Sequence, residues 1–169
     1  PFIEALKCEN VKNSYRLILY GNTISNEKWN QLGLSEIAEY RGWLDYSKDV
    51  STLKDIDVFL QLLDDNNVSK AGWPNKLGDY LAFGKPVILS PYGDIIDFVK
   101  NEKGFFIVEY NKYSILKILQ EIKDIPYSDL KTMGYANRQL AEKISWKNRA
   151  KNIEYICNKI RFNNETVKN

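Results

Sequence analysis

Short apolar runs recur along the first two thirds of the chain and alternate with segments of helical period. The runs cover residues 15–20, 37–40, 56–60, 86–89 and 104–108. Most of them lack a polar residue at alternate positions, which is typical of strands covered on both faces. Between them, apolar residues have helical spacing over residues 48–54, 74–83 and 95–100. This alternation predicts βαβ units and therefore a parallel sheet.

The last third of the chain has a purely helical pattern. An apolar stripe over residues 115–122 is ended by Pro126, and a second helix is predicted over residues 127–143. A third helix is predicted from Trp146, with Ser145 as its N-cap. We therefore predict one α/β domain over residues 1–162, with a Rossmann-like parallel sheet, helices on both faces and a helical C-terminal appendage. A polar tail is expected over residues 163–169.

Composition narrows the range of functions. With 44% apolar and 27% charged residues among 169, the chain has the composition of a folded globular domain. Its net charge is only +2 and its basic residues are scattered, so we expect no nucleic-acid partner. The absence of histidine excludes Ser-His-Asp and Cys-His nucleophile systems and His-bearing zinc sites. Cys8 and Cys157 favour reduced thiols over a disulfide, and we expect a cytoplasmic protein.

The segment from residue 71 to residue 87 carries the strongest chemical signal. Gly72 permits a tight turn, Pro74 suits the first position of a helix, and Gly84 with Pro86 suits its end. The start of such a helix favours an anion, because free N–H groups and the helix dipole both attract phosphate. One turn later Asp79 lies beside Asn75, where its carboxylate could accept hydrogen bonds from ribose hydroxyls. The alternative is that Asp79 and its neighbour Lys76 are ordinary solvated surface residues.

The same segment resembles a known family. The run P-N-K-L-G-D-Y-L-A-F-G-K-P-V-I at residues 74–88 is similar to the donor-site helix of GT-B glycosyltransferases, particularly the large family 4 (group 1) of retaining enzymes. Further similarity follows in the same order along the chain, at residues 40–44, 57–60, 90–99, 101–105 and 144–146. The resemblance implies the C-terminal, nucleotide-sugar-binding half of such an enzyme. It implies donor-binding roles for Gly72, Trp73, Pro74, Asn75, Lys76 and Asp79.

Two departures from the family pattern are important. The family has two glutamates at this segment: the first corresponds to Ala71 and the second to Asp79. An aspartate can keep the ribose-binding role, but an alanine cannot contact the transferred sugar or support catalysis, so no catalytic residue is assigned. The family's basic diphosphate-binding segment follows its first strand and would precede Pro1. Because Phe2, Ile3 and Leu6 have helical spacing, we expect the chain to begin inside a helix and to lack that strand and the N-terminal half.

Three further residues are candidates for the donor cleft. Gly21 resembles a family turn that lines the cleft, although an ordinary glycine after a strand is equally compatible with the sequence. Gly42 and Trp43 could offer backbone groups or an aromatic face to the base, whereas the alternative for Trp43 is a core tryptophan.

The resemblance implies transfer of a hexosyl unit from a nucleoside diphosphate sugar to a glycan or a lipid-linked acceptor. The expected partners are the donor and an N-terminal acceptor-binding half, through which the protein could associate peripherally with the membrane. No metal or other cofactor is expected, and this chain alone is expected to be inactive. The alternative is a non-catalytic GT-B scaffold, because Ala71 has replaced an acid. A sugar-nucleotide epimerase is less compatible, since such enzymes rely on histidines.

Overall fold

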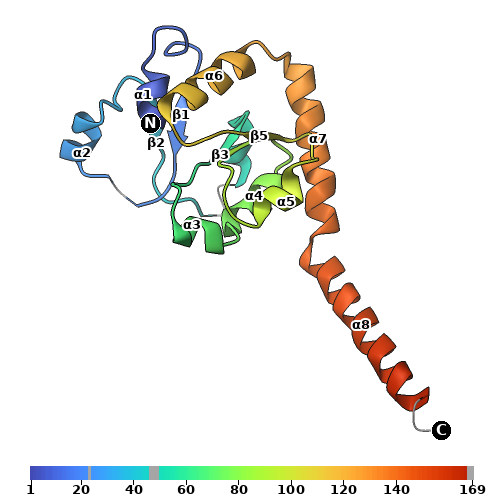
Figure 1. The fold of residues 1–169 in the computed structure, drawn as a ribbon. Coiled ribbons are helices and arrows are strands. Elements are labelled where there is room, and N and C mark those ends of the chain that lie inside the picture. The colour runs from blue at the N-terminus through green and yellow to red at the C-terminus, as the bar shows by residue number, and fades with distance from the viewer. Residues whose placement is uncertain (23, 46–49, 167–169) are drawn as a thin grey trace.

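The computed structural model describes residues 1–22, 24–45 and 50–166 (Figure 1). The strands among these residues are β1 (Leu17–Leu19), β2 (Ala38–Tyr40), β3 (Phe59–Gln61), β4 (Val87–Leu89) and β5 (Phe105–Ile107). The helices before β4 are α1 (Phe2–Leu6), α2 (Asn26–Gln31), the 3-10 helix η1 (Val50–Asp55), α3 (Asn67–Ala71) and α4 (Asn75–Ala82). After it come α5 (Ile95–Val99), α6 (Lys112–Lys123), α7 (Tyr127–Lys143) and α8 (Trp146–Thr166).

All strand pairs are parallel, as the sequence predicts, but the described strands form two sheets. One sheet contains β1 and β2, and the other has the order β3-β4-β5. Leu17 is opposite Ala38 in the first sheet, and Val87 lies between Phe59 and Phe105 in the second. The fold class is therefore confirmed, while the expected single sheet is divided between β1 and β3.

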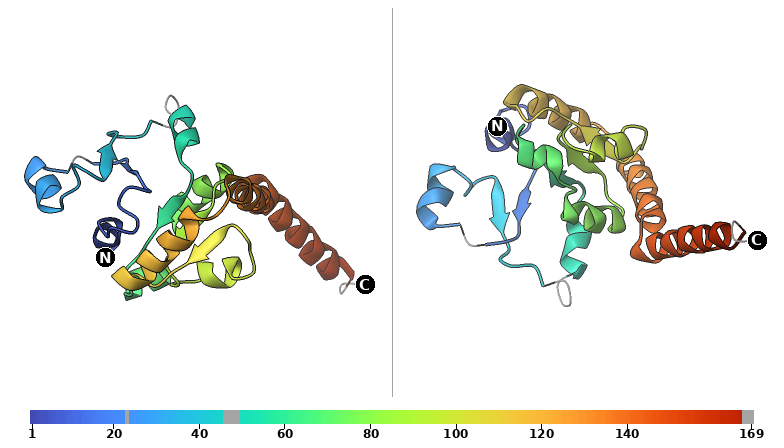
Figure 2. Two further views of the ribbon diagram at one scale, coloured as in Figure 1. Left: turned by 90° about the horizontal axis from the view of Figure 1, so that it is seen from above. Right: turned by 60° about the horizontal axis from the view of Figure 1, so that its bottom comes forward.

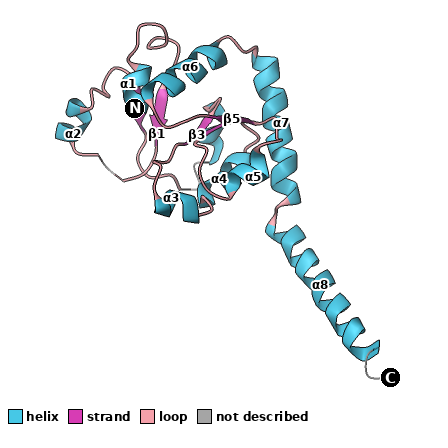
Figure 3. Ribbon diagram, viewed as in Figure 1, coloured by secondary structure: helices cyan, strands magenta, loops and turns pink. Residues whose placement is uncertain are grey.

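Helices cover both faces of the second sheet, and the side chains of β4 show how. Val87 and Leu89 are fully buried in one apolar cluster, together with Leu77 and Leu81 of α4. Ile88, between them in sequence, points to the opposite face and joins a cluster that includes residues of α1 and α6. Successive side chains in a strand point to opposite faces of the sheet. Because both faces of β4 are buried, every residue of this strand must be apolar. Figure 3 shows the short strands between these helices.

The buried side chain of Asn137 on α7 joins the segments that precede two strands. Its Nδ2 atom donates to the carbonyl oxygen of Lys85, before β4, at 2.8 Å and to that of Gly104, before β5, at 2.9 Å. Buried backbone carbonyls need such partners. Asn137 therefore anchors the amino ends of β4 and β5, at the edge of the sheet opposite to their carboxyl ends.

Some helices differ from the prediction. Helices α2 and α3 are short and were not predicted, because five or six residues carry too little periodicity. Residues 48 and 49 of the helix predicted over residues 48–54 lie outside the described residues, and residues 50–55 form the 3-10 helix η1. Helix α8 continues to Thr166, through part of the expected tail, and residues 167–169 lie outside the described residues. Both views of Figure 2 show α8 extending away from the rest of the chain.

Candidate functional site

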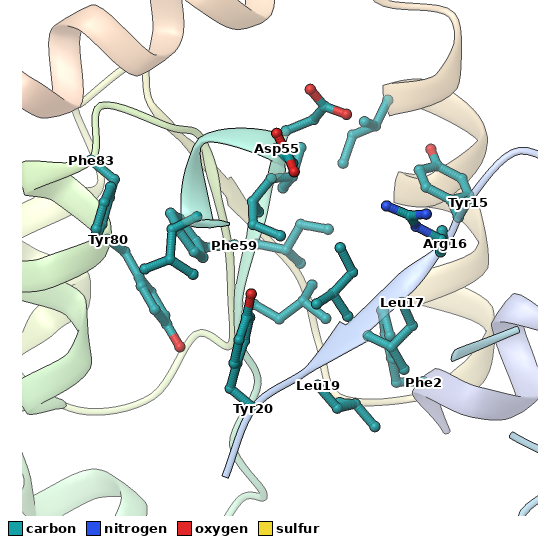
Figure 4. Close-up of a pocket in the computed structure, with 18 of the residues that line it drawn as sticks. Phe2, Tyr15, Arg16, Leu17, Leu19, Tyr20, Asp55, Phe59, Tyr80 and Phe83 are labelled. Atoms are coloured by element: carbon teal, nitrogen blue, oxygen red, sulfur yellow. The ribbon is translucent and has the colours of Figure 1, made fainter. Parts of the chain in front are cut away.

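A cavity of about 730 Å³ lies between β1 and β3, and one end of it opens at the carboxyl ends of these strands (Figure 4). Tyr20 and Gly21 line it directly after β1, and Trp43 and Leu44 line it after β2. Helix α4 contributes the remaining side chains at this end of the cavity, which are Lys76, Asp79 and Tyr80. In open parallel sheets, ligands bind outside the carboxyl ends of the strands, so this end of the cavity is the candidate site.

Helix α4 is held in place by its apolar face, as the sequence predicts. Leu77 and Leu81 are fully buried. The ring of Tyr80 stacks on that of Phe59 in β3, with the ring centroids 4.3 Å apart and the planes 4° from parallel. This packing fixes the rotation of the helix and places Lys76 and Asp79 on the cavity.

The ends of helix α4 follow the predicted turn chemistry. Pro74 is the N-cap and the helix begins at Asn75, so the predicted first position, Pro74, differs from the observed one by one residue; Pro74 makes no side-chain capping bond. Gly84 has a φ of 64°, the left-handed conformation expected of a glycine just beyond a helix. The N–H of Leu77 donates to the carbonyl of Pro74 at 3.0 Å, so among the described residues the N–H groups of Asn75 and Lys76 are the ones left for other acceptors at the start of α4.

Two glycines shape the loops after β1 and β2. Gly21 has a φ of 138° and Gly42 a φ of 75°, conformations that favour glycine. The N–H of Gly21 donates to the carbonyl of Gly42 at 2.9 Å, and the Tyr40 hydroxyl donates to the carbonyl of Gly21 at 2.8 Å. A Cβ atom at either glycine would have no neighbour within 4 Å, so the requirement is conformational rather than steric. These bonds hold the two loops side by side at the rim of the cavity.

A polar network fixes Tyr20 below these loops. Its hydroxyl donates to Thr52 Oγ1 at 3.0 Å and accepts from the Arg41 guanidinium at 3.3 Å. The Nε of Arg41 also donates to Glu39 at 2.7 Å, and this bond lowers the pKa of the Glu39 carboxyl below its ordinary value. The bond to Thr52 ties the residue after β1 to η1, and the charge-assisted bonds of Arg41 tie it to β2.

The predicted site residues separate into two groups. Gly21, Trp43, Lys76 and Asp79 line the cavity, whereas the other predicted residues are not among the described residues that line it: Gly42, Gly72, Trp73, Pro74 and Asn75. The ring of Trp73 packs edge-on against Phe98 of α5, with the centroids 5.3 Å apart. Trp43 is 72% exposed, so the alternative that it is a core residue is wrong.

Ala71 is exposed at the end of α3. The N-cap of this helix, Asn66, accepts from the N–H of Ser69 at 2.8 Å through its side chain. Position 71, for which the resemblance predicts the place of the family's first glutamate, therefore carries a methyl group at the surface.

The sequence analysis missed a second polar group at the same edge of the sheet. Asp64, Tyr92 and Glu109 each follow the end of a strand by two or three residues. The hydroxyl of Tyr92 donates to Glu109 Oε2 at 2.9 Å, and this bond raises the pKa of Tyr92, with smaller contributions from the charges of Asp64 and Asp65. Asp65 pairs with Lys70 at 2.5 Å. The position of each residue just after a strand was the signal that could have found this group.

Comparison with known proteins assigns the chain to a family. The sequence profile described as "Glycosyl transferases group 1" matches residues 2–140. The chain belongs to the group 1 glycosyltransferases. None of the curated proteins compared matches it.

Several solved structures have a similar fold. Sucrose-phosphate synthase (tll1590) from Thermosynechococcus elongatus matches with a TM-score of 0.68 at 16% identity, over 94% of this chain and 42% of that one. A glycosyltransferase from Rickettsia africae ESF-5 matches with a TM-score of 0.67 at 18% identity, over 91% and 42%. Anabaena Alr3699/HepE in complex with UDP matches with a TM-score of 0.62 at 16% identity, over 84% and 39%. This group 1 glycosyltransferase chain therefore spans about two fifths of the length of these relatives.

The described residues of this group 1 glycosyltransferase chain contain neither a metal-ligand cluster nor a membrane-spanning helix. Over residues 1–22, 24–45 and 50–166, no three His, Cys, Asp or Glu residues converge as metal ligands. Within the same part of the chain, no helix combines the length and apolar character needed to cross a membrane.

Proposed function

We propose that this chain is the donor-binding part of a glycosyltransferase that moves a hexosyl unit from a nucleoside diphosphate sugar to a glycan or a lipid-linked acceptor. The observation that carries the proposal is the convergence of Gly21, Trp43, Lys76 and Asp79 on one cavity at the carboxyl ends of the strands. These residues are separated by up to 58 positions in the sequence, and they combine an aromatic face, a cation and a carboxylate. These three kinds of group suit the base, the diphosphate and the ribose hydroxyls of a nucleoside diphosphate, respectively.

Each of these residues has a role that follows from its chemistry. The Lys76 ammonium and the N-terminal N–H groups of α4 bind the diphosphate. The Asp79 carboxylate accepts hydrogen bonds from the ribose hydroxyls, and the exposed ring of Trp43 stacks on the base. Gly21, without a side chain, lets the backbone approach the donor closely. HepE from Anabaena, which has a similar fold, was crystallised in complex with UDP, which supports a nucleoside diphosphate as the ligand.

Sugar transfer also requires a surface that binds the acceptor. In the reaction, the bond between the sugar C1 and the diphosphate oxygen breaks, a bond forms between C1 and an acceptor hydroxyl oxygen, and the hydroxyl proton leaves to a base. The residues of this chain bind and orient the donor, which is a large contribution in such group transfers. The acceptor is held by an N-terminal half of the full-length protein, which also provides a peripheral contact with the cytoplasmic face of the membrane.

The alternative function is a non-catalytic scaffold, and the alanine at position 71 favours it. The side chain there cannot provide the charge that the family's first glutamate supplies. Under this alternative the cavity keeps its shape but the full-length protein transfers no sugar.

Calorimetric titration of the full-length protein with uridine, guanosine and adenosine diphosphates tests the proposed binding site. We expect Asp79→Ala to weaken binding of the preferred nucleotide by about 1–3 kcal/mol, the usual cost of removing charge-assisted hydrogen bonds. Asp97→Ala is the matched control, because Asp97 lies on α5 and pairs with Lys100 at 2.9 Å. Equal affinity of the Asp79→Ala and unsubstituted proteins would refute the site. Nucleotide binding without transfer to any glycan or lipid-linked acceptor would favour the scaffold.

A further inference from the structure

Gly21 lies where the loops after β1 and β2 meet, and its backbone forms part of the cavity rim. A glycine restricts its own backbone less than any other residue, so bonds to neighbouring groups have to fix its conformation. Both of its backbone polar groups make such bonds. The N–H donates to the carbonyl of Gly42 at 2.9 Å, and the carbonyl accepts from the hydroxyl of Tyr40 at 2.8 Å. The loop after β1 is therefore held at this point by the end of β2.

The side chain of Tyr40 is itself held in place. Tyr40 is the last residue of β2, is partly buried and pairs with Leu19 of β1. Its ring lies edge-on to that of Trp29 in α2, with the centroids 6.4 Å apart and the planes at 65°. Trp29 in turn packs against the apolar cluster that includes residues of α1 and α6. The ring is thus fixed by the strand and by α2, and its hydroxyl is directed at Gly21.

Arg41 attaches the same two loops from the opposite face. In an extended chain successive side chains point to opposite faces, so Arg41 lies across the end of β2 from Tyr40. Its guanidinium donates to the hydroxyl of Tyr20 at 3.3 Å, and its N–H donates to the carbonyl of Leu19 at 3.0 Å. Two successive residues at the end of β2 thus bond two successive residues after β1.

The two attachments differ in what they fix. Arg41 bonds the side chain of Tyr20, which also packs against the apolar cluster of α4 and β4. Tyr40 bonds the backbone of Gly21, which has no side chain to pack. Loss of the Tyr40 hydroxyl would therefore release the Gly21 peptide group. It would also loosen the carbonyl of Gly42, which the N–H of Gly21 holds one residue before Trp43.

We propose that Tyr40 is a positioning residue for the base of the donor. Its hydroxyl fixes Gly21, and Gly21 fixes the carbonyl of Gly42. These two bonds hold the exposed ring of Trp43 where it stacks on the base. This inference rests on the proposed function, since Tyr40 acts through Trp43 and makes no contact with the donor itself.

The donor site therefore has two halves that are held independently. Tyr40 holds the half that binds the base. The half that binds the ribose and the diphosphate lies on α4, which is fixed by the burial of Leu77 and the stacking of Tyr80 on Phe59. A change at Tyr40 is expected to disturb the first half and leave the second intact.

Calorimetric titration of the full-length protein with its preferred nucleoside diphosphate tests this role. We expect Tyr40→Phe, which keeps the ring beside Trp29, to raise the Kd about fivefold, the equivalent of one hydrogen bond. Tyr15→Phe is the matched control, because it also removes a bond from a phenol to a backbone carbonyl, that of Leu119. The Kd of the control should stay within about twofold of that of the unsubstituted protein. Equal affinity loss in the two variants, or none in Tyr40→Phe, would overturn the proposal.

Double variants show whether Tyr40 acts through Trp43. In a Trp43→Ala background, Tyr40→Phe should change the Kd by less than about twofold, because the ring that it positions has been removed. In an Asp79→Ala background the loss of about fivefold should remain, since Asp79 lies on α4. The same loss in both backgrounds would indicate a general structural effect and contradict the proposal.

Amide hydrogen exchange gives a readout that does not depend on the nucleotide. The amide of Gly21 should exchange about tenfold faster in Tyr40→Phe than in the unsubstituted protein. The amide of Leu17, which donates to the carbonyl of Ile37 within the same sheet, is the internal control and should be unchanged. Unchanged exchange at Gly21 would show that the hydroxyl does not fix this residue, and would overturn the proposal.

Failure of this inference is distinguishable from failure of the proposed function. If Asp79→Ala binds the nucleotide as tightly as the unsubstituted protein does, the donor site itself is refuted, and the role of Tyr40 with it. If Asp79→Ala weakens binding and Tyr40→Phe does not, the donor site stands and only the role of Tyr40 is wrong.

Discussion

The amide group of Asn137 occupies the place where any residue other than glycine at position 104 would carry its Cβ atom. A Cβ built on Gly104 would lie 1.9 Å from Oδ1 and 2.2 Å from Cγ of Asn137. The close approach allows the Nδ2 atom of Asn137 to bond both Gly104 and Lys85. The glycine and the asparagine, 33 positions apart, therefore form one structural unit.

Gly104→Ala should destabilise the protein by about 1–3 kcal/mol, since overpacking of a buried site has this cost. Chemical denaturation measures the free energy of unfolding. Gly78→Ala in α4 is the control: a Cβ there would have no neighbour within 4 Å, and alanine in a helix should be neutral or stabilise by about 0.5–1 kcal/mol. In the double variant, the Asn137→Ala substitution removes the clash with the new Cβ atom. The double variant should therefore lose less free energy of unfolding than the two single variants lose in sum. Strict additivity would show that the two residues are not coupled.

Trp43→Ala should weaken nucleotide binding by about 1–3 kcal/mol, the usual loss when a stacking aromatic is removed. Its effect on the free energy of unfolding should be small, because the side chain is 72% exposed. Trp43→Phe should restore part of the affinity, since it keeps an aromatic face. The matched control is Trp146→Ala on α8, a tryptophan that is 84% exposed and not among the described residues that line the cavity. Equal loss of affinity in both alanine variants would argue against a stacking role for Trp43.

Sugar transfer by the full-length protein should continue in the presence of excess EDTA. In the proposed site, the diphosphate charge is neutralised by Lys76 and the N-terminal N–H groups of α4, so a divalent cation is not needed for that purpose. The measurement is the initial rate of transfer with and without the chelator, and Lys76→Ala should reduce that rate in both conditions. Loss of activity with EDTA that added Mg²⁺ restores would show that a metal ion performs this role.

The stability of the protein should fall as the pH rises from about 10 to about 12 because of Tyr15. Burial raises the pKa of its phenol from 10.0 to about 12, and the hydroxyl donates to the carbonyl of Leu119. Below pH 10 the group is protonated in both the folded and the unfolded chain, so its contribution is constant. Above it, the unfolded chain loses the proton first and is favoured.

Denaturation of the Tyr15→Phe variant at several pH values tests this prediction. Near neutral pH the variant should be less stable than the unsubstituted protein by about 1 kcal/mol, the typical net value of one hydrogen bond. That difference should shrink between pH 10 and 12, because phenylalanine does not titrate. Tyr113→Phe is the control, since Tyr113 is 82% exposed. The same pH dependence in all three proteins would exclude Tyr15 as the source.

The sequence by itself determined the elements whose cause is local. The apolar run at residues 86–89 became β4, and the helix predicted over residues 74–83 became α4, with Leu77 and Leu81 buried and Gly84 in the left-handed conformation. Periodicity, capping and turn conformation depend on neighbouring residues and can be read from a single chain. The parallel arrangement follows as well, since strands joined by helices pair in this way.

Tertiary structure decided which loops meet. It placed Trp43 on the cavity and Trp73 against Phe98, although the sequence offered both as donor-binding residues. It also joined Asn137 to Gly104 and separated β1 from β3, and no local pattern indicates either result. These relationships depend on packing between segments that are distant in the sequence. Such packing is determined only when all the strands and helices are assembled into one close-packed interior.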